Sequence, residues 1–420
     1  MKAERDLLSI EAATQVIVFI YESMDRSGGI QSIVFRQIEI AKKFNKHVFV
    51  ICKYSTPLKD VPSKVRLDFQ KSSEDLLKEI EIRVPHQKLN LDIIAFSPEA
   101  APIGFLLQTE ALKKRHVIRA SLSLTILHPR DLMRETEKRH VHLMNKFVAH
   151  AIGLQNLVFM NEQCRITHSA FLSRDLSSNK IVPVPIDERE PRWMNRTNDG
   201  PVRIICVGRI VNFKAYNFAL PSILAKFAEE GRSVSCDIFG YGSDEAKLTD
   251  LIKQYGVSDV LKFRGSIPLE KFDDLVSDYD LFIGMGTAAL QAAQLGVPTI
   301  LAIVDDEHGA HGFIDSAPFG NLGENDPSTP RRDLKKLIEA YLNASPQERM
   351  KISLDGIRYA NRYVTDDYVE QLTQSSVSRE GVARRLAVIY CHFYLWMARD
   401  NWLRKAVRLL KAQSTPRKPL

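Results

Sequence analysis

Short apolar runs alternate with longer segments of helical periodicity along most of the chain. Runs at residues 15–20, 47–52, 91–96 and 157–160 predict buried strands, and a helix is expected over about residues 30–44. The alternation begins again at residues 203–207, with further strands expected at 233–239, 261–263, 281–283 and 299–302. Strands that alternate with crossover helices form parallel sheets with helices on both faces. The predicted class is therefore α/β, with two doubly wound, Rossmann-like domains facing a central cleft.

A polar stretch rich in charge and turn formers separates the two halves. We predict an N-terminal domain over residues 1–186, a linker at 187–201 and a C-terminal domain over 202–380. Residues 381–420 are expected to form a helical extension. In tandem domains of this kind, the carboxyl ends of both sheets can face one ligand.

Composition excludes several classes of protein. The 420 residues are 45% hydrophobic and 26% charged, values typical of globular chains. The five cysteines are widely spaced without a Cys-x-x-Cys motif, which argues against a disulfide framework or a zinc site. No run of about twenty apolar residues and no secretory signal is apparent, so we expect a cytoplasmic protein.

The net charge of +7 is concentrated at one end. Residues 381–420 contain nine Lys or Arg against the single acid Asp400, a net +8, which leaves −1 on residues 1–380. A protein that binds nucleic acid through its core would spread basic charge over a folded face. We therefore predict no nucleic-acid partner.

Five ordered motifs occupy the second half of the chain. They are Gly-Arg-Ile-Val-Asn-Phe-Lys at 208–214, Ile-Phe-Gly-Tyr-Gly-Ser-Asp-Glu at 238–245, Lys-Phe-Arg-Gly-Ser-Ile-Pro at 262–268, Tyr-Asp-Leu-Phe at 279–282 and Leu-Gln-Ala-Ala-Gln-Leu-Gly-Val-Pro at 290–298. Their order resembles the donor-binding half of group 1 (family 4) glycosyltransferases of the GT-B fold. The resemblance is close over residues 201–300 and looser over 11–200, where it depends on Ser-Gly-Gly at 27–29 and Ile-Val-Pro-Val-Pro-Ile-Asp at 181–187.

The resemblance implies a site for a nucleoside diphosphate sugar. Transfer of the sugar expels a diphosphate, and positioned cations stabilise its growing charge. The resemblance assigns this role to Arg209 and Lys214, after Gly208; the alternative is a pair of solvated loop cations. Gly286 and Thr287 occupy a strand-to-helix turn, where helix N–H groups can bind phosphate. The alternative there is a tight turn with a helix cap.

The sequence departs from the family at two acidic positions. Many members carry two glutamates eight residues apart, and alignment on the Gly-Val-Pro at 296–298 places Gln291 at the ribose position and Ile283 at the other. The short loop between them resembles that of GT-B enzymes that use UDP-N-acetylglucosamine and of sugar-nucleotide epimerases. An amide can bind a ribose diol, but without the charge assistance of a carboxylate.

Two loops of the first half supply further candidates. The resemblance implies that Gly28 and Gly29 approach the donor phosphate or the sugar, the alternative being a plain turn. His128 ends an apolar stretch and is a candidate for orienting the sugar or moving a proton; a structural histidine is the alternative. His308 and His311 lie three residues apart beside acids, yet we expect no metal site, and this loop either contacts the donor or is structural.

The basic tail has amphipathic periodicity over residues 382–411. Its apolar part is too short to cross a bilayer, so we predict that the tail lies on the anionic inner face of the plasma membrane. The alternative is a helix packed on the protein with a solvated basic face. The predicted membrane residues are Arg384, Arg385, Trp396, Trp402, Arg404, Lys405 and Arg408.

These observations lead to one functional hypothesis and two alternatives. The protein is expected to be a retaining glycosyltransferase of the hexosyltransferase type, which moves a sugar from a nucleoside diphosphate sugar to a lipid-linked or polysaccharide acceptor in surface glycan biosynthesis. No cofactor or metal is expected, because the nucleotide sugar is a substrate. The alternatives are a sugar-nucleotide epimerase of the same fold and an inactive membrane-associated scaffold of a polysaccharide assembly complex.

Overall fold

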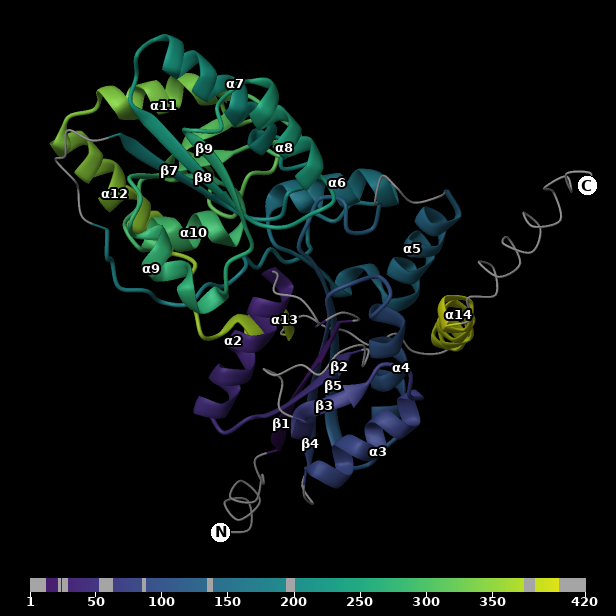
Figure 1. The fold of residues 1–420 in the computed structure, drawn as a ribbon. Helices are drawn as coiled ribbons and strands as arrows, with labels where there is room; N and C mark the ends of the chain where they lie inside the picture. The colour runs from purple at the N-terminus through teal and green to yellow at the C-terminus, as the bar shows by residue number, and fades with distance from the viewer. Residues whose placement is uncertain are drawn as a thin grey trace, which may run out of the picture. The chain divides into compact units, whose positions relative to one another are not determined.

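The computed structural model describes residues 13–21, 24, 29–52, 63–84, 88–133, 139–193, 201–373 and 382–399 (Figure 1). Their contacts divide the chain into two compact units. The first consists of Met1–Val182 and Asp367–Leu420, and the second is Pro183–Asp366. Each unit is a parallel-sheet α/β domain with helices, which confirms the predicted class.

The first sheet has the order β3-β2-β1-β4-β5-β6, and all its neighbours are parallel. Its central strands are buried on both faces, which explains their nearly continuous apolar sequences. The strand order reverses direction between β1 and β4, at the switch point of a doubly wound sheet. The strands are β1 (Thr14–Ile20), β2 (His47–Cys52), β3 (Arg66–Asp68), β4 (Leu89–Ala95), β5 (Val117–Ile126) and β6 (Leu157–Phe159).

Helices connect these strands, and side chains cap α3 and α6 at their N-termini. Ser72 accepts a hydrogen bond from the amide of Asp75, and Asn161 accepts one from the amide of Cys164. The helices are α2 (Gly29–Lys43), α3 (Ser73–Arg83), α4 (Ala101–Ala111), α5 (Arg139–Ile152) and α6 (Glu162–Leu172), with short 3-10 turns at Ser63–Val65 and Leu154–Asn156.

The C-terminal segment returns to the first unit. α13 (Tyr368–Thr373) packs on β4 and β5, and the Ser123 hydroxyl donates to the Leu372 carbonyl at 2.7 Å. Lys46 forms an ion pair with Glu370. α14 (Val382–Arg399) packs on α4 and α5 of the same unit (Figure 1). The contacts therefore differ from the sequence division, which assigned residues 202–380 to one domain and set the tail apart.

The second sheet has the order β13-β12-β11-β10-β7-β8-β9. Five strands are parallel, while β12 and β13 are antiparallel additions at one edge that the sequence pattern did not predict. β12 has the sequence Gly-Ala-His-Gly-Phe, whose two glycines hide any strand pattern. The strands are β7 (Val202–Val207), β8 (Val234–Phe239), β9 (Leu261–Gly265), β10 (Leu281–Gly284), β11 (Thr299–Ala302), β12 (Gly309–Phe313) and β13 (Arg332–Asp333).

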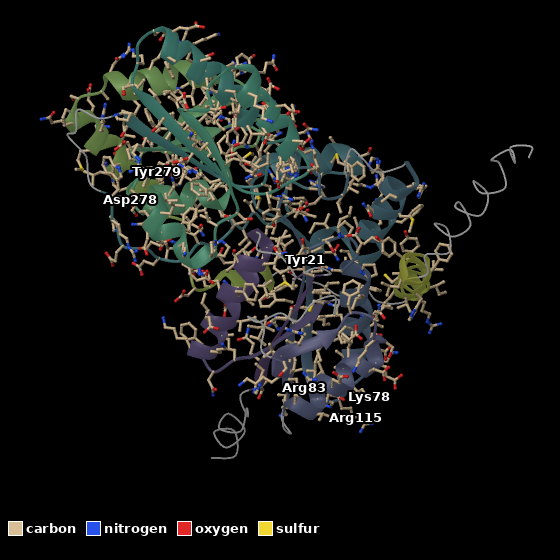
Figure 2. The ribbon with its side chains drawn as sticks, viewed as in Figure 1. Tyr21, Lys78, Arg83, Arg115, Asp278 and Tyr279 are labelled. Carbon is tan, nitrogen blue, oxygen red and sulfur yellow. The ribbon has the colours of Figure 1, made fainter. Side chains whose placement is uncertain are left out.

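Local contacts fix the starts of β7 and β10. The Arg203 guanidinium donates to the Asp278 carbonyl at 3.0 Å and lies 4.5 Å from the Tyr279 ring centroid. Asp278 and Tyr279 are labelled in Figure 2. α12 begins with a capping box between Ser345 and Glu348. The helices of this unit are α7 (Tyr216–Glu229), α8 (Glu245–Gln254), α9 (Phe272–Val276), α10 (Thr287–Gln294), α11 (Leu334–Asn343) and α12 (Pro346–Asn361), with 3-10 turns at Leu269–Lys271 and Ile314–Ser316.

The first part of the predicted linker is docked on the second unit. The amides of Arg192 and Trp193 both donate to the Leu295 carbonyl, at 2.9 and 3.0 Å. The Trp193 side chain is buried, and the amide of Ile186 donates to the Tyr363 carbonyl. This part of the polar stretch is therefore held in place on the second unit.

Candidate active site

The carboxyl edge of the second sheet gathers the predicted donor residues. β7 and β10 are adjacent and parallel. The next strand after β7 is its outer neighbour β8, whereas the next strand after β10 is β11, on the other side of the pair, so the strand order reverses here. In open α/β sheets, ligands bind at this kind of switch point. The loop after β7 contains Arg209 and Lys214, while the turn after β10 contains Gly286. Two neighbouring loops of one edge therefore carry the predicted phosphate-binding groups.

Glycines allow the loops after β7 and β8 to pack backbone against backbone. A Cβ at Gly240 would lie 1.8 Å from the carbonyl oxygen of Gly208, and one at Gly242 would lie 1.9 Å from that of Ile210. The Gly208 amide also donates to the Phe239 carbonyl at 2.9 Å. These contacts fix the course of the loop that carries the two cations.

Arg209 and Lys214 have no carboxylate partner among the described residues. The Arg209 guanidinium is exposed and lies 5.4 Å from the Phe213 ring centroid. Lys214 is half-buried by surface area, but its ammonium lies close to the backbone, 2.5 Å from where a Cβ of Gly208 would be.

Loss of hydration and the neighbouring Arg209 together lower the pKa of Lys214 to about 8. Burial is the larger cause, and repulsion between the two cations is the second. The charged ammonium is therefore less stable here than in water, and a bound anion would stabilise it. Two adjacent cations without a counter-ion are suited to bind a diphosphate.

The turn after β10 presents the start of α10. Gly286 is the N-cap, with a φ of 75° that glycine adopts without strain, and no side chain caps the helix. Thr287 is the first helical residue rather than the cap. The first N–H groups of a helix lack intrahelical acceptors and lie at the positive end of its dipole. This turn can therefore bind a phosphate oxygen.

Gln291 lies one turn after Thr287 on the same face of α10. Its side chain is half-buried and forms no hydrogen bond with the described residues. Ile283 is buried inside β10, so the other position of the family's glutamate pair carries an apolar side chain that packs in the core. Gln291 is thus a half-buried polar side chain on the face of α10 that follows Thr287.

The buried carboxylate of Glu324 stabilises the turn at Gly286 through hydrogen bonds of the Leu322 backbone. Glu324 accepts a hydrogen bond from the Leu322 amide at 2.7 Å, and the Leu322 carbonyl accepts one from the Gly286 amide at 2.7 Å. His311 is buried, with Nε2 2.9 Å from the Glu324 carbonyl oxygen. These contacts show that Glu324 and His311 hold the loop against the turn at Gly286. Whether the loop also contacts the donor stays a prediction.

The histidine pair of the same region is not brought together as a metal site. His308 is exposed and its amide donates to Asp306, whereas His311 lies buried on β12. Within the residues that the structure describes, no group of three or more His, Cys, Asp or Glu side chains is arranged to hold a metal ion.

Gly29 and His128 lie at the carboxyl edge of the first sheet. Gly29 is the exposed first residue of α2, and a Cβ there would meet no atom within 4 Å; Gly28 lies outside the described residues. His128 follows β5, and its Nδ1 accepts from the Arg130 amide at 3.1 Å. The neutral ring therefore carries its proton on Nε2. Asp131 accepts the His128 amide at 2.9 Å and so fixes this loop.

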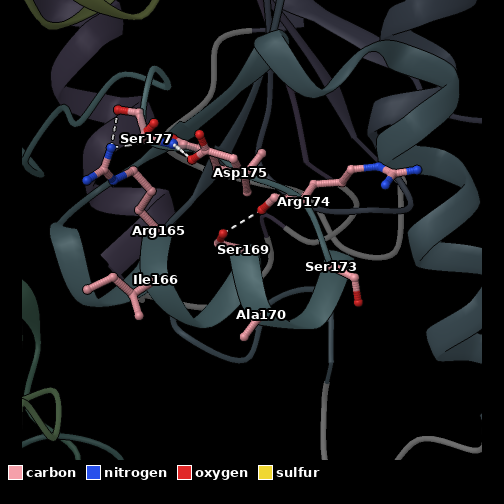
Figure 3. A pocket seen from close by; sticks show the side chains of 9 residues that line it. Arg165, Ile166, Ser169, Ala170, Ser173, Arg174, Asp175 and Ser177 are labelled. Atoms are coloured by element: carbon pink, nitrogen blue, oxygen red, sulfur yellow. Dashed lines mark hydrogen bonds between the residues drawn. The ribbon is translucent and has the colours of Figure 1, made fainter.

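A hollow of about 530 Å³ at the end of α6 contains none of the predicted site residues (Figure 3). Its polar groups already have partners: Arg165 pairs with Glu162 at 2.6 Å, and the Ser169 hydroxyl donates to the Arg174 carbonyl. We assign it no function. Its lining residues are Arg165, Ile166, Ser169, Ala170, Ser173, Arg174, Asp175, Leu176 and Ser177.

The predicted membrane residues are only partly described. Arg384 donates to the Thr109 hydroxyl at 3.2 Å, whereas Arg385 is exposed. Trp396 lies within α14 but its side chain is not described, and the remaining predicted residues, Trp402, Arg404, Lys405 and Arg408, lie outside the described residues. Among the described helices, none combines the length and apolar character needed to cross a membrane.

The second unit, which carries the two cations, matches a known protein family. Residues 187–349 match the family of group 1 glycosyl transferases. The matched segment contains Arg209, Lys214, Gly286 and Gln291.

Two curated relatives and one solved structure illustrate the similarity. The chain is 27% identical over 184 residues to WcaL of Escherichia coli, a glycosyltransferase assigned to colanic acid biosynthesis, covering 41% of this chain and 43% of the relative. It is 23% identical over 229 residues to the GtfA subunit of the UDP-N-acetylglucosamine–peptide N-acetylglucosaminyltransferase of Streptococcus gordonii, covering 52% and 44%. The chain thus spans less than half the length of these relatives.

The structure of Staphylococcus aureus TarM, solved with UDP and alpha-GlcNAc-glycerol among its ligands, superposes with a TM-score of 0.57. The sequence identity is 10%, and the match covers 86% of this chain and 98% of TarM. At this identity the likeness concerns the fold alone. The fold is GT-B.

Proposed function

We propose that the protein is a glycosyltransferase of the hexosyltransferase type that uses a nucleoside diphosphate sugar. Its acceptor would be a lipid-linked or polysaccharide glycan in surface glycan biosynthesis, and the transfer would retain the anomeric configuration. The family match over residues 187–349, the GT-B fold and relatives named for sugar transfer support this proposal. The observation that carries it is the pair of cations, Arg209 and Lys214, without a carboxylate partner among the described residues.

Arg209 and Lys214 would bind the donor diphosphate and stabilise it as it leaves. Negative charge on the leaving group grows in the transition state, so fixed cations stabilise that state more than the bound substrate. The lowered pKa of Lys214 reflects an ammonium with little water and no counter-ion around it. Two side-chain cations would supply the positive charge, so the proposal includes no metal ion or other cofactor.

The start of α10, which follows β10, would bind the nucleotide. The amides of Gly286-capped α10 would bind a phosphate oxygen, with the Thr287 hydroxyl as a further donor. The Gln291 amide can donate one hydrogen bond and accept another from a ribose diol. Gly208 would act through Lys214, because only a residue without a side chain leaves room for the ammonium.

In the first unit, we assign Gly28, Gly29 and His128 to the sugar and acceptor side. His128 carries its proton on Nε2 when neutral, which suits it to orient a sugar hydroxyl. No side chain stands out as a nucleophile. Catalysis would therefore depend mainly on stabilisation of the leaving group. We further infer that the protein works in the cytoplasm, on the inner face of the plasma membrane, with the basic tail as support for this location.

The direct test is to incubate the protein with UDP sugars and GDP sugars and to measure binding, donor hydrolysis and transfer. Slow hydrolysis that stops in Arg209→Ala and Lys214→Ala would support the proposal. Conversion of the donor to another sugar nucleotide without acceptor would indicate the epimerase instead. Absence of binding to every donor would indicate the inactive scaffold and contradict the proposal.

A further inference from the structure

The helix α14 has two apolar faces, and among the described residues only one of them is buried. Ala387, Cys391, Tyr394 and Leu395 are buried, and the helix packs on α4 and α5. On the other side, Leu386, Ile389 and Phe393 are 63%, 64% and 51% exposed. Their spacing of three and four residues puts them in one stripe along the helix. These three side chains therefore form an apolar stripe that is more than half exposed in the described structure.

The neighbouring helix α5 extends this stripe. Leu143 and Phe147, four residues apart, are 54% and 51% exposed. The Phe147 ring lies 5.6 Å from the Tyr390 ring, and the Tyr390 hydroxyl donates to the Met144 carbonyl at 3.1 Å. Tyr390 is four residues from Leu386 and three from Phe393, so it connects the two helices' exposed side chains.

We propose that the α5/α14 surface, defined as Leu143, Phe147, Leu386, Ile389 and Phe393, binds the protein to a bilayer of anionic lipid. This inference deepens the membrane part of the proposed function. Its observations are independent of the donor site. Exposed apolar side chains are common singly, but a contiguous group on two packed helices marks a membrane or protein contact.

The positive charge near this surface favours a membrane over a protein partner. Arg385 is exposed on α14, and the sequence that follows the helix contains Arg404, Lys405, Arg408 and further cations. Residues 381–420 have a net charge of +8, against −1 for the rest of the chain. Apolar side chains flanked by cations are the pattern that binds anionic bilayers in the plane of their surface.

The covered face of α14 determines how the proposal must be tested. α4 has the sequence Ala-Pro-Ile-Gly-Phe-Leu-Leu-Gln-Thr-Glu-Ala, and most of its side chains are buried on all sides. α14 packs on this helix, so deletion of residues 381–420 would expose new apolar surface. The deleted protein could bind lipid or aggregate for that reason alone. Point substitutions in the exposed stripe avoid this problem.

The experiment is flotation of the full chain with vesicles of phosphatidylcholine alone or mixed with phosphatidylglycerol. We expect binding to the mixed vesicles, weakened by salt, and little binding to phosphatidylcholine alone. The double variant Ile389→Asp with Phe393→Asp should lower the affinity at least about tenfold, because two apolar side chains no longer enter the bilayer. A matched control is Met350→Asp with Leu354→Asp on α12, where the side chains are 41% and 50% exposed; it should bind like wild type.

Two results would overturn the proposal. One is equal vesicle binding by the wild type and the stripe variant, with both unfolding at the same temperature. The other is an oligomeric wild type that ignores vesicles while the stripe variant is monomeric in sedimentation velocity, because the surface would then join copies of the chain. UDP binding is measured in the same samples. Loss of vesicle binding with normal UDP binding supports this surface, and loss of UDP binding alone concerns the donor site.

Discussion

The carboxyl edges of the two sheets differ in how their polar groups are satisfied. In the first unit, the His128 ring and the Asp131 carboxylate already accept backbone hydrogen bonds from their own loop. In the second unit, Arg209 and Lys214 share a loop without an acidic partner among the described residues. Uncompensated charge is unfavourable in the empty protein and favourable with an anion bound. We therefore expect electrostatic recognition of an anion to belong to the second unit, and we expect the first unit to contribute shape and orientation.

The largest effect is expected from removal of a cation. Arg209→Ala or Lys214→Ala should lower kcat by about a hundredfold to a thousandfold, because the leaving diphosphate loses a fixed charge. The measurement is initial rate of transfer or donor hydrolysis. Lys262→Ala is the matched control, since Lys262 is an exposed cation of the same unit whose ammonium, among the described residues, donates to the Ser258 carbonyl and pairs with no carboxylate. Normal rates in both site variants would contradict the assignment.

Two glycines of the site should respond differently to alanine. In Gly208→Ala the new Cβ would displace the flexible end of Lys214, so UDP affinity should fall about tenfold with little change in the unfolding temperature. In Gly242→Ala the Cβ would meet the Ile210 backbone, and the free energy of unfolding should fall by about 1–3 kcal/mol. Calorimetry of UDP binding and thermal unfolding measure the two effects. Equal behaviour of both variants would show that Gly208 does not position the ammonium.

The affinity for UDP should depend on pH through Lys214. Its pKa is lowered to about 8 in the empty site, so binding should weaken as pH rises through 8 and the ammonium loses its proton. Lys214→Arg, whose guanidinium stays charged, should bind UDP with a flatter pH profile. The check is calorimetric titration between pH 7 and pH 9. A wild-type affinity that stays constant over this range would contradict the proposed role.

The same pKa shift has a consequence for stability without ligand. Lys214 has a lower pKa in the folded protein than the ordinary 10.5, so between pH 8 and 10.5 the unfolded chain binds more protons. This group's contribution therefore makes the folded state more stable as pH rises through that window. Lys214→Met should remove the rise, which denaturant unfolding at several pH values would reveal. An identical pH dependence in the variant would show that the ammonium is not desolvated.

The smallest effect is expected in the first unit. His128→Gln retains an amide N–H near the position of Nε2–H and should lower kcat by about threefold, whereas His128→Ala should lower it by about tenfold. Neither change should alter UDP affinity, which tests the division of labour between the two sheets. Loss of UDP binding in both variants would remove the contrast.

The sequence predicted those features that have a local pattern. Buried parallel strands are continuous apolar runs, so β1, β2 and β7 were found within a residue or two. The motif at 208–214 predicted the cation loop, whose ends are set by β7 and α7. The sequence could not predict that α13 packs in the first unit, because the ion pair of Lys46 with Glu370 joins residues 324 positions apart.

Other features of the candidate site have no local sequence pattern that could predict them. The chain of bonds from Glu324 through Leu322 to Gly286 depends on how a distant loop folds back on β10. The lowered pKa of Lys214 depends on burial of one ammonium in a surface loop, which no sequence pattern reveals. On α14, periodicity indicated an amphipathic helix, but only packing shows which apolar side chains are covered.

Calorimetric titration of UDP into the wild type, Arg209→Ala, Lys214→Ala and His128→Ala tests the central claim most directly. If the two cations of the second unit seat the diphosphate, each of their variants should bind UDP at least about tenfold more weakly, while His128→Ala binds like the wild type. If UDP binds all four proteins equally, or only the histidine variant loses affinity, the diphosphate is not bound by this pair.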